Sequence, residues 1–184
     1  MHHQDTLKQV SLDERGLGKA YVLAPGEGEH SQANNSSRSL WARAVDTNGD
    51  MSIIVSEGDE SAPTMPHYHE RTSEALYVIS GVIRVWLDDQ KGNRYIHDVH
   101  AGEFGTLPRG WIHAWAFAAP NSKQIGIIAP GGFERIVDYL DPNRPTTIEQ
   151  LRASEDTIDV RWMPDYPLFQ LCEEAERQRT ANAG

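Results

Sequence analysis

The stretch PHYHERTSE at residues 66–74 decides the predicted fold and site, together with GEFGTLPRGWIH at residues 102–113. Both stretches are rich in groups that bind metal ions. They contain three histidines and one glutamate: His67, His69, Glu74 and His113. Imidazole nitrogens and carboxylate oxygens are common ligands of divalent transition metals. We therefore predict that these four side chains bind one metal ion per chain.

The spacing within residues 66–74 shows how the first three ligands meet. Side chains alternate between the two faces of a strand, so His67 and His69 point the same way, about 6 to 7 Å apart along the chain. Glu74 follows His69 at an odd spacing, so an unbroken strand would turn it to the other face. The polar residues 70–73 are typical of a turn. We therefore predict a bend there, followed by a strand that begins with Glu74 facing inward.

The alternative interpretation is that the histidines are exposed or are ordinary core residues. Burying three imidazoles and a carboxylate without partners would cost several kcal/mol, and a bound metal ion removes this cost. The metal site is therefore the better interpretation.

The same residues carry a resemblance to the cupin family of small β-barrels. The spacing of the first cupin motif is met by His67, His69, Glu74 and Gly81, and that of the second by Gly102, Pro108, Gly110 and His113. Two positions depart from the motifs: Gly58 lies too far upstream of His67, and Phe117 stands where the second motif has Asn. The resemblance implies an all-β cupin fold, a double-stranded β-helix or jelly-roll barrel. It also implies that His67, His69, Glu74 and His113 are the metal ligands.

The remaining chain divides into three expected regions. Residues 1–39 have no clear period and are expected to form an irregular N-terminal arm, with one short strand at residues 20–23. Residues 40–130 contain short apolar, β-branched runs separated by turn residues, which indicates an antiparallel barrel or sandwich. Residues 131–184 are expected to form a C-terminal helical extension packed on the barrel.

Three helices are expected in this extension. Apolar residues at helical spacing predict the first over residues 133–140. A short helix is expected at residues 147–151, and a terminal helix at residues 167–179.

Composition excludes several classes of function. The 184 residues carry a net charge of −10, which repels nucleic acids and anionic membranes. Cys172 is the only cysteine, so an internal disulfide and a cysteine zinc site are excluded. The start of the sequence lacks an apolar signal core and no long apolar run follows, so a soluble, cytoplasmic protein is expected.

The ligand set predicts a catalytic type of metal site. Three neutral imidazoles and one carboxylate leave a divalent ion with a net charge near +1 and one or two open coordination positions. An anionic substrate would be drawn to such a site. The ligands suit Fe, Mn, Ni, Co, Cu or Zn and do not choose among them.

Strand parity predicts the walls of the cavity beside the metal. Leu76 and Val78 share the face of Glu74, Trp115 and Phe117 share that of His113, and Ile53 and Val55 are expected to face them. The alternative interpretation of each of these residues is that it belongs to the ordinary hydrophobic core of the barrel. Together they predict an apolar cavity without inward Arg, Lys or Asn, which argues against sugar phosphates and oxalate. An aromatic substrate with one anionic chelating edge fits better.

The segment GIIAPGGFER at residues 126–135, with the chain length and the short helices, resembles the single-domain quercetin 2,3-dioxygenases. This resemblance implies a flavonol bound as its 3-hydroxyl anion, incorporation of both atoms of O₂, and opening of the heterocycle with release of carbon monoxide. Glu74 would be a metal ligand and the catalytic acceptor of the flavonol proton. Phe133 would be an aromatic residue near the substrate.

Two other functions stay open. The chain would act as a cupin dioxygenase or oxidase on another aromatic enol, diketone or polyketide, or it would be a non-catalytic metallocupin that binds a small molecule. The resemblance also implies a homodimer.

Overall fold

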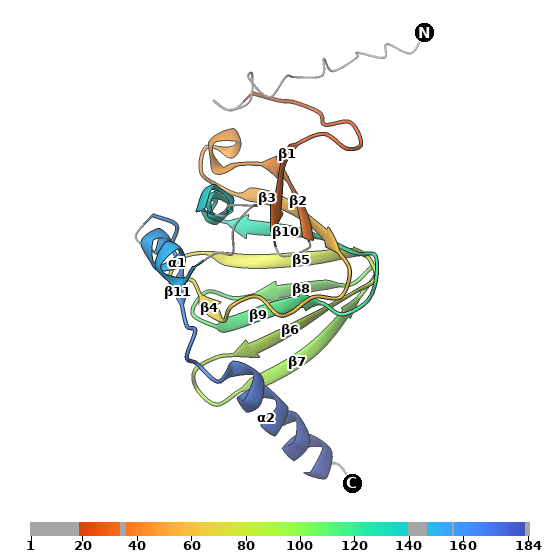
Figure 1. The fold of residues 1–184 in the computed structure, drawn as a ribbon, viewed down its shortest axis with the longest axis vertical. Coiled ribbons are helices and arrows are strands. Elements are labelled where there is room, and N and C mark those ends of the chain that lie inside the picture. Colours follow the sequence, from red (N-terminus) through yellow and green to blue (C-terminus); the bar gives the residue numbers. More distant parts are fainter. Residues whose placement is uncertain (1–18, 34–35, 140–146, 156, 183–184) are drawn as a thin grey trace.

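The computed structural model describes residues 19–33, 36–139, 147–155 and 157–182 (Figure 1). The first part of the expected N-terminal arm, residues 1–18, and Leu140 at the end of the first expected helix lie outside the described residues.

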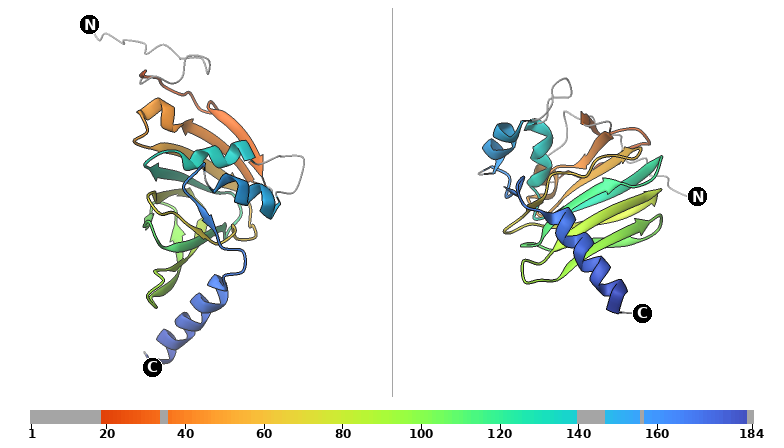
Figure 2. Two further views of the ribbon diagram at one scale, coloured as in Figure 1. Left: turned by 90° about the vertical axis from the view of Figure 1, so that its left-hand side faces the viewer. Right: turned by 60° about the horizontal axis from the view of Figure 1, so that its bottom comes forward.

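Two antiparallel sheets form the body of the described chain and face each other (Figures 1 and 2). The larger sheet has six strands in the order β1-β2-β3-β10-β5-β8. Their bounds are Glu29–Ala33 (β1), Ser36–Ala42 (β2), Ser52–Gly58 (β3), Ser122–Ala129 (β10), Ser73–Ser80 (β5) and Phe104–Leu107 (β8).

The smaller sheet has five strands in the order β11-β4-β9-β6-β7. Their bounds are Arg161–Trp162 (β11), His67–Tyr68 (β4), Ile112–Phe117 (β9), Val82–Asp88 (β6) and Arg94–His100 (β7). The two-sheet arrangement confirms the predicted all-β jelly-roll fold.

Apolar side chains fill the space between the sheets. Alternate residues of β5 and β6 point inward, as the strand period requires. The central cluster contains the buried residues Leu76, Val78, Ile83, Val85, Leu87, Val99, Leu107 and Phe117. Leu107 and Leu87 of this cluster pair in register with Glu74 and His113, so the packed core borders the candidate ligands.

Gly81 makes the tight turn between β5 and β6. Its φ of +70° lies in the region that favours glycine. A Cβ at this position would lie 2.2 Å from Ser122 Oγ and 2.6 Å from Ser122 Cα. Because the Ser122 backbone would clash with any Cβ, glycine is required at this point, where the chain passes from one sheet to the other.

The N-terminal region differs from the expectation. No strand forms at residues 20–23; instead β1 and β2 extend the larger sheet, with β2 paired to β3. The polar strand β1 has no apolar alternation to reveal it, because its strand geometry comes from pairing with β2. Most of the segment assigned to the arm from Glu29 onward is therefore part of the sheet.

The C-terminal region contains a short 3₁₀ helix and two α-helices. A 3₁₀ helix, η3, spans Phe133–Tyr139 in place of the expected α-helix, and another, η2, spans Ala44–Thr47. Helix α1 spans Ile148–Ser154 and α2 spans Leu168–Asn182, which confirms the two other predicted helices.

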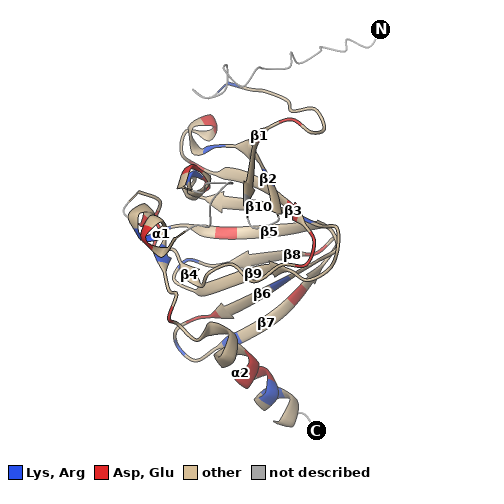
Figure 3. Cartoon of the chain, in the orientation of Figure 1, with Lys and Arg blue, Asp and Glu red and all other residues tan. Residues whose placement is uncertain are grey.

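Helix α2 packs its buried Leu168 and Cys172 against Ile112 and Ala114 of β9. Its exposed face carries residues of both charges (Figure 3). Within the described part of the chain, no helix is both long and apolar enough to cross a membrane.

Asp88, at the end of β6, anchors the segment that leads into α2. Its side chain is fully buried and accepts hydrogen bonds from Arg94 Nε (2.7 Å), Tyr166 Oη (2.7 Å) and Gln90 N (2.7 Å). Burial alone would raise the pKa of Asp88, but hydrogen bonds from Tyr166, Arg94 and Gln90 outweigh it and lower the pKa below its ordinary value of 3.8.

We expect Asp88→Asn to lower the free energy of unfolding by about 1 to 3 kcal/mol at pH 7, because an amide cannot accept all three hydrogen bonds. Because the pKa of Asp88 is depressed in the folded state, its stabilisation is present above the unfolded pKa and is lost as pH falls through the folded pKa. Urea unfolding of the unsubstituted protein and of Asp88→Asn, measured between pH 7 and pH 3, checks this. The difference between their free energies of unfolding should narrow below about pH 4.

The control is Asp98→Asn, which breaks the exposed Arg84–Asp98 pair at 2.6 Å. Exposed pairs contribute about 0 to 1 kcal/mol, so this change should be small. Equal losses in the two variants would contradict the anchoring role of Asp88.

Candidate metal centre

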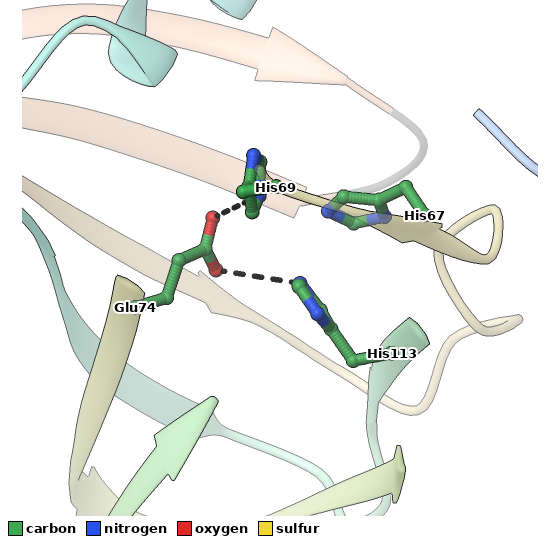
Figure 4. A group of neighbouring side chains, drawn as sticks. All are labelled: His67, His69, Glu74 and His113. Atoms are coloured by element: carbon green, nitrogen blue, oxygen red, sulfur yellow. Dashed lines mark ion pairs between the residues drawn. The ribbon is translucent and has the colours of Figure 1, made fainter. Parts of the chain in front are cut away.

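The structure brings together the four side chains that the two sequence stretches predict (Figure 4). One ligand atom from each residue lies within 4.8 Å of those of the others. His67 in β4 pairs directly with His113 in β9, and Glu74 reaches the group from β5 in the other sheet. His67, His69 and His113 are buried, with 3%, 1% and 1% of their surface exposed. The cluster therefore joins the two sheets across the barrel.

A bend after His69 turns Glu74 toward the histidines, as the odd spacing requires. The bend lies at Glu70 and Arg71, between β4 and β5. The Asp159 carboxylate accepts hydrogen bonds from the backbone N–H of Arg71 (2.9 Å) and of Thr72 (2.8 Å). Asp159 thus satisfies two amides that the bend removes from the sheet.

Backbone carbonyls determine which nitrogen of each histidine faces the centre. His67 Nδ1 lies 2.8 Å from the Met65 carbonyl oxygen, and His113 Nδ1 lies 3.0 Å from that of Trp111. His69 Nδ1 contacts the Asp159 carbonyl oxygen in the same way. A carbonyl accepts only from N–H, so each neutral ring carries its proton on Nδ1 and presents the lone pair of Nε2.

The inward-facing atoms lack hydrogen-bond partners. The Nε2 atoms of all three histidines and Glu74 Oε1 are buried and make no hydrogen bond. His69 Nε2 lies 3.1 Å from Glu74 Oε1 and His113 Nε2 lies 3.9 Å from Glu74 Oε2, yet neutral Nε2 has no proton to donate. A divalent cation would satisfy these lone pairs together, so the donor set fits a metal ion.

The charges of the cluster also favour a cation. Burial alone would raise the pKa of Glu74, but the contact with His69 and the neighbouring imidazoles lower it to about 2. Burial is the main cause that lowers the pKa values of His67 and His113. Burial would also lower the pKa of His69, but Glu74 and the Asp159 carbonyl outweigh it and raise the value. The group therefore offers an ionised carboxylate and, in His67 and His113, two weakly basic imidazoles.

A cavity of about 560 Å³ opens beside the cluster, and both His67 and Glu74 line it. Of the predicted wall residues, the structure places Leu76, Trp115 and Phe133 at this cavity. The Phe133 ring stacks on His67, with centroids 5.7 Å apart and an angle of 25° between the rings.

The other predicted wall residues lie elsewhere. Val78 and Phe117 are buried in the central core cluster beyond the cavity. On β3 the cavity is lined by Ile54 and Ser56, so Ile53 and Val55 belong to the opposite face of the strand. The expected parity of this strand was therefore off by one residue, because its register is set by pairing with β10 and β2 rather than by its own uniformly apolar pattern.

Sequence reasoning missed three residues around the site. Asp159 and Trp162 come from the C-terminal region, and the Trp162 ring lies 4.9 Å from that of His67. Arg38 lines the cavity from β2, so the expectation of a cavity without inward basic residues was wrong. The available signal was that Arg38 is two residues before the buried Leu40 and shares its face, but that segment was assigned to the arm.

Comparisons with known proteins agree with this fold and ligand set. The profile of the family described as "Cupin domain" matches residues 51–122, which contain all four candidate ligands. The quercetin 2,3-dioxygenase of Bacillus subtilis is 28% identical over 114 residues, which is 62% of this chain and 32% of that protein. The quercetin 2,3-dioxygenase of Aspergillus japonicus is 29% identical over 83 residues, 45% of this chain and 24% of that protein. This chain thus spans about a third or less of the length of these relatives.

Solved structures share the fold. The structure of KdgF from Halomonas sp. superposes with a TM-score of 0.51 at 21% identity, covering 61% of this chain and 94% of that chain. The two-sheet barrel, the ligand spacing and these matches lead to one conclusion. Residues 51–122 of the chain form a cupin domain, and this domain resembles that of quercetin 2,3-dioxygenases.

Proposed function

We propose that the protein is a metal-dependent dioxygenase that opens the heterocycle of a flavonol such as quercetin with O₂ and releases carbon monoxide. The observation that carries this proposal is the cluster of one carboxylate and three imidazoles with unpartnered Nε2 atoms at the wall of a largely apolar cavity. The similarity to two quercetin 2,3-dioxygenases supports it.

The cavity has the size and lining that a flat aromatic substrate requires. Its volume of about 560 Å³ lies within the range of small-molecule sites, roughly 300 to 1,000 Å³. Leu76, Leu107, Trp115 and Ile128 supply apolar walls, and Phe133 stands beside the ligand rings. Such walls hold aromatic rings and exclude water from the reacting edge.

His67, His69, Glu74 and His113 would hold one divalent transition metal. Such an ion would supply positive charge and open coordination positions for an ionised hydroxyl group. Glu74 is ionised at neutral pH because its pKa is about 2, so it can accept a hydrogen bond or proton from the 3-hydroxyl of the flavonol. The overall reaction then adds both oxygen atoms to the opened product and expels one ring carbon as carbon monoxide.

Two alternatives share the same ligands. A dioxygenase or oxidase for another aromatic enol, diketone or polyketide would use the same cavity, whereas a metallocupin without turnover would only bind its ligand. Oxygen consumption separates the enzymes from the binding protein, and product analysis separates the substrates.

The first test mixes metal-loaded protein with quercetin, without O₂ and then with O₂. We expect a shifted quercetin spectrum under anaerobic conditions, followed by consumption of O₂ and release of an equal amount of carbon monoxide. A spectral shift without O₂ consumption in every metal form would favour the binding protein. Turnover of another enol but not of quercetin would favour the second enzyme.

The role of Glu74 is tested by Glu74→Gln. The amide keeps the shape but cannot take up the proton, so we expect the rate of O₂ uptake to fall about 10²- to 10⁴-fold. Metal content must be measured in the same samples, because Glu74 is also a candidate ligand. The matched control is Glu60→Gln at an exposed position away from the cavity. Undiminished turnover by Glu74→Gln with metal bound would disprove the proton-acceptor role.

The Asp159 carboxylate holds the bend that turns Glu74 toward the histidines, so we expect Asp159→Ala to weaken metal binding about 10- to 100-fold. Asp159→Asn keeps an acceptor oxygen and should lose less metal affinity than Asp159→Ala. Competition with a chelator measures the affinity, and Asp165→Ala, at an exposed position in the same region, is the control. Unchanged affinity in Asp159→Ala would show that the bend is held without this carboxylate.

A further inference from the structure

The cavity contains a positively charged side chain at a distance from the metal centre. Arg38 lines the cavity, and its Nη1 atom is buried without a hydrogen-bond partner. Burial alone lowers the pKa of Arg38 from its ordinary value, and no carboxylate of the described residues counteracts it. A guanidinium nitrogen that is buried without an acceptor is costly, because it loses hydration without gaining a hydrogen bond.

Gln124 is a second unpaired polar group at the same cavity. Its Oε1 atom is buried and has no hydrogen-bond partner. Arg38 pairs in register with Ser56 on β3, and Ser56 pairs with Gln124 on β10. These three residues therefore form one polar row across three neighbouring strands, and all three line the cavity.

The polar row and the metal centre lie at opposite ends of an apolar floor. The next inward-facing row of the sheet contains Ile54, Gly126 and Leu76. The row beyond it contains Ile128, which pairs with Glu74. Gln124 and Ile128 are four residues apart on β10, so the two ends are separated by about 13 Å along the strand. Gly126 has no side chain, so the floor between them stays open.

We propose that Arg38 and Gln124 form a polar subsite that binds an acidic oxygen, a phenolate or a carboxylate, on the end of the substrate away from the metal centre. The inference rests on the proposed function in one respect: the opposite end of the substrate carries the enol that reacts. The guanidinium N–H groups of Arg38 donate charge-assisted hydrogen bonds to such an oxygen, and Gln124 donates to it through Nε2–H₂, because Oε1 can only accept.

This arrangement defines the substrate class more narrowly than the metal ligands do. The ligand is long and flat, has an apolar middle, and carries an acidic group at its remote end. Oxalate has only two carbons and is too short to contact both ends. A flavonol with an acidic group on an outer ring has the required length and chemistry.

The test measures binding under anaerobic conditions, so it does not depend on turnover. The probes are 3-hydroxyflavone and derivatives of it that carry a single hydroxyl or carboxylate on either outer ring. We expect at least one acidic derivative to bind metal-loaded protein about tenfold or more tightly than 3-hydroxyflavone. Whether the hydroxyl or the carboxylate series gains more identifies the acidic group.

Arg38→Met keeps much of the side-chain volume and removes the charge. We expect it to weaken binding of the preferred acidic derivative about 10- to 100-fold and to leave binding of 3-hydroxyflavone unchanged. Gln124→Leu should weaken binding of the same derivative by a smaller factor. The control is Arg84→Met, on β6, where the arginine is exposed and paired with Asp98. Equal affinity of all the probes, or equal effects of Arg38→Met on acidic and neutral probes, would overturn the proposal.

Thermal unfolding of the ligand-free protein gives a second readout. An unpaired buried charge destabilises the fold, so Arg38→Met should raise the melting temperature. A lower melting temperature would show that Arg38 stabilises the fold and would overturn its assignment to a ligand. Admitting O₂ after the binding measurement tests the polar subsite and the dioxygenase activity separately. Selective binding without O₂ consumption would support the subsite and refute the dioxygenase.

Discussion

The hydrogen bonds from the three Nδ1 atoms to backbone carbonyls are the constraint on which the site depends. Each carbonyl can only accept, so each ring carries its proton on Nδ1 and turns an unprotonated Nε2 toward Glu74. With the three rings neutral, four groups that can each present a lone pair meet in a buried place where these atoms have no hydrogen-bond partner. Such a group is unfavourable by itself and favourable around a cation, which makes the fold a preformed binding site.

Two distant parts of the chain keep this arrangement in place. The bend at Glu70 and Arg71 changes the parity between His69 and Glu74, and it is held by Asp159. The carbonyl of the same residue orients His69. The C-terminal region therefore belongs to the site as much as the barrel does, because it supplies the acceptors that the bend and the ring require.

The cavity has two kinds of polar end joined by apolar walls. Glu74 and the histidines lie at one end, and the unpaired groups of Arg38 and Gln124 lie at the other. Most buried polar groups in proteins have partners, so the unpaired Nη1 donor of Arg38 at the cavity indicates where an acceptor oxygen of a ligand would bind. A small diacid satisfies only one end, whereas a long aromatic acid satisfies both.

The candidate ligand cluster, the all-β class and the two α-helices were predictable from the sequence, because they depend on patterns within short segments. Parity and a polar turn are enough to relate His67, His69 and Glu74. The contacts of Asp159, the position of Arg38 at the cavity and the inward face of β3 became visible only in the folded chain. Asp159 meets its partners from almost ninety residues away, and Arg38 and β3 take their orientation from pairing with neighbouring strands. Such contacts leave no local pattern, because the partner that fixes each side chain is distant in sequence.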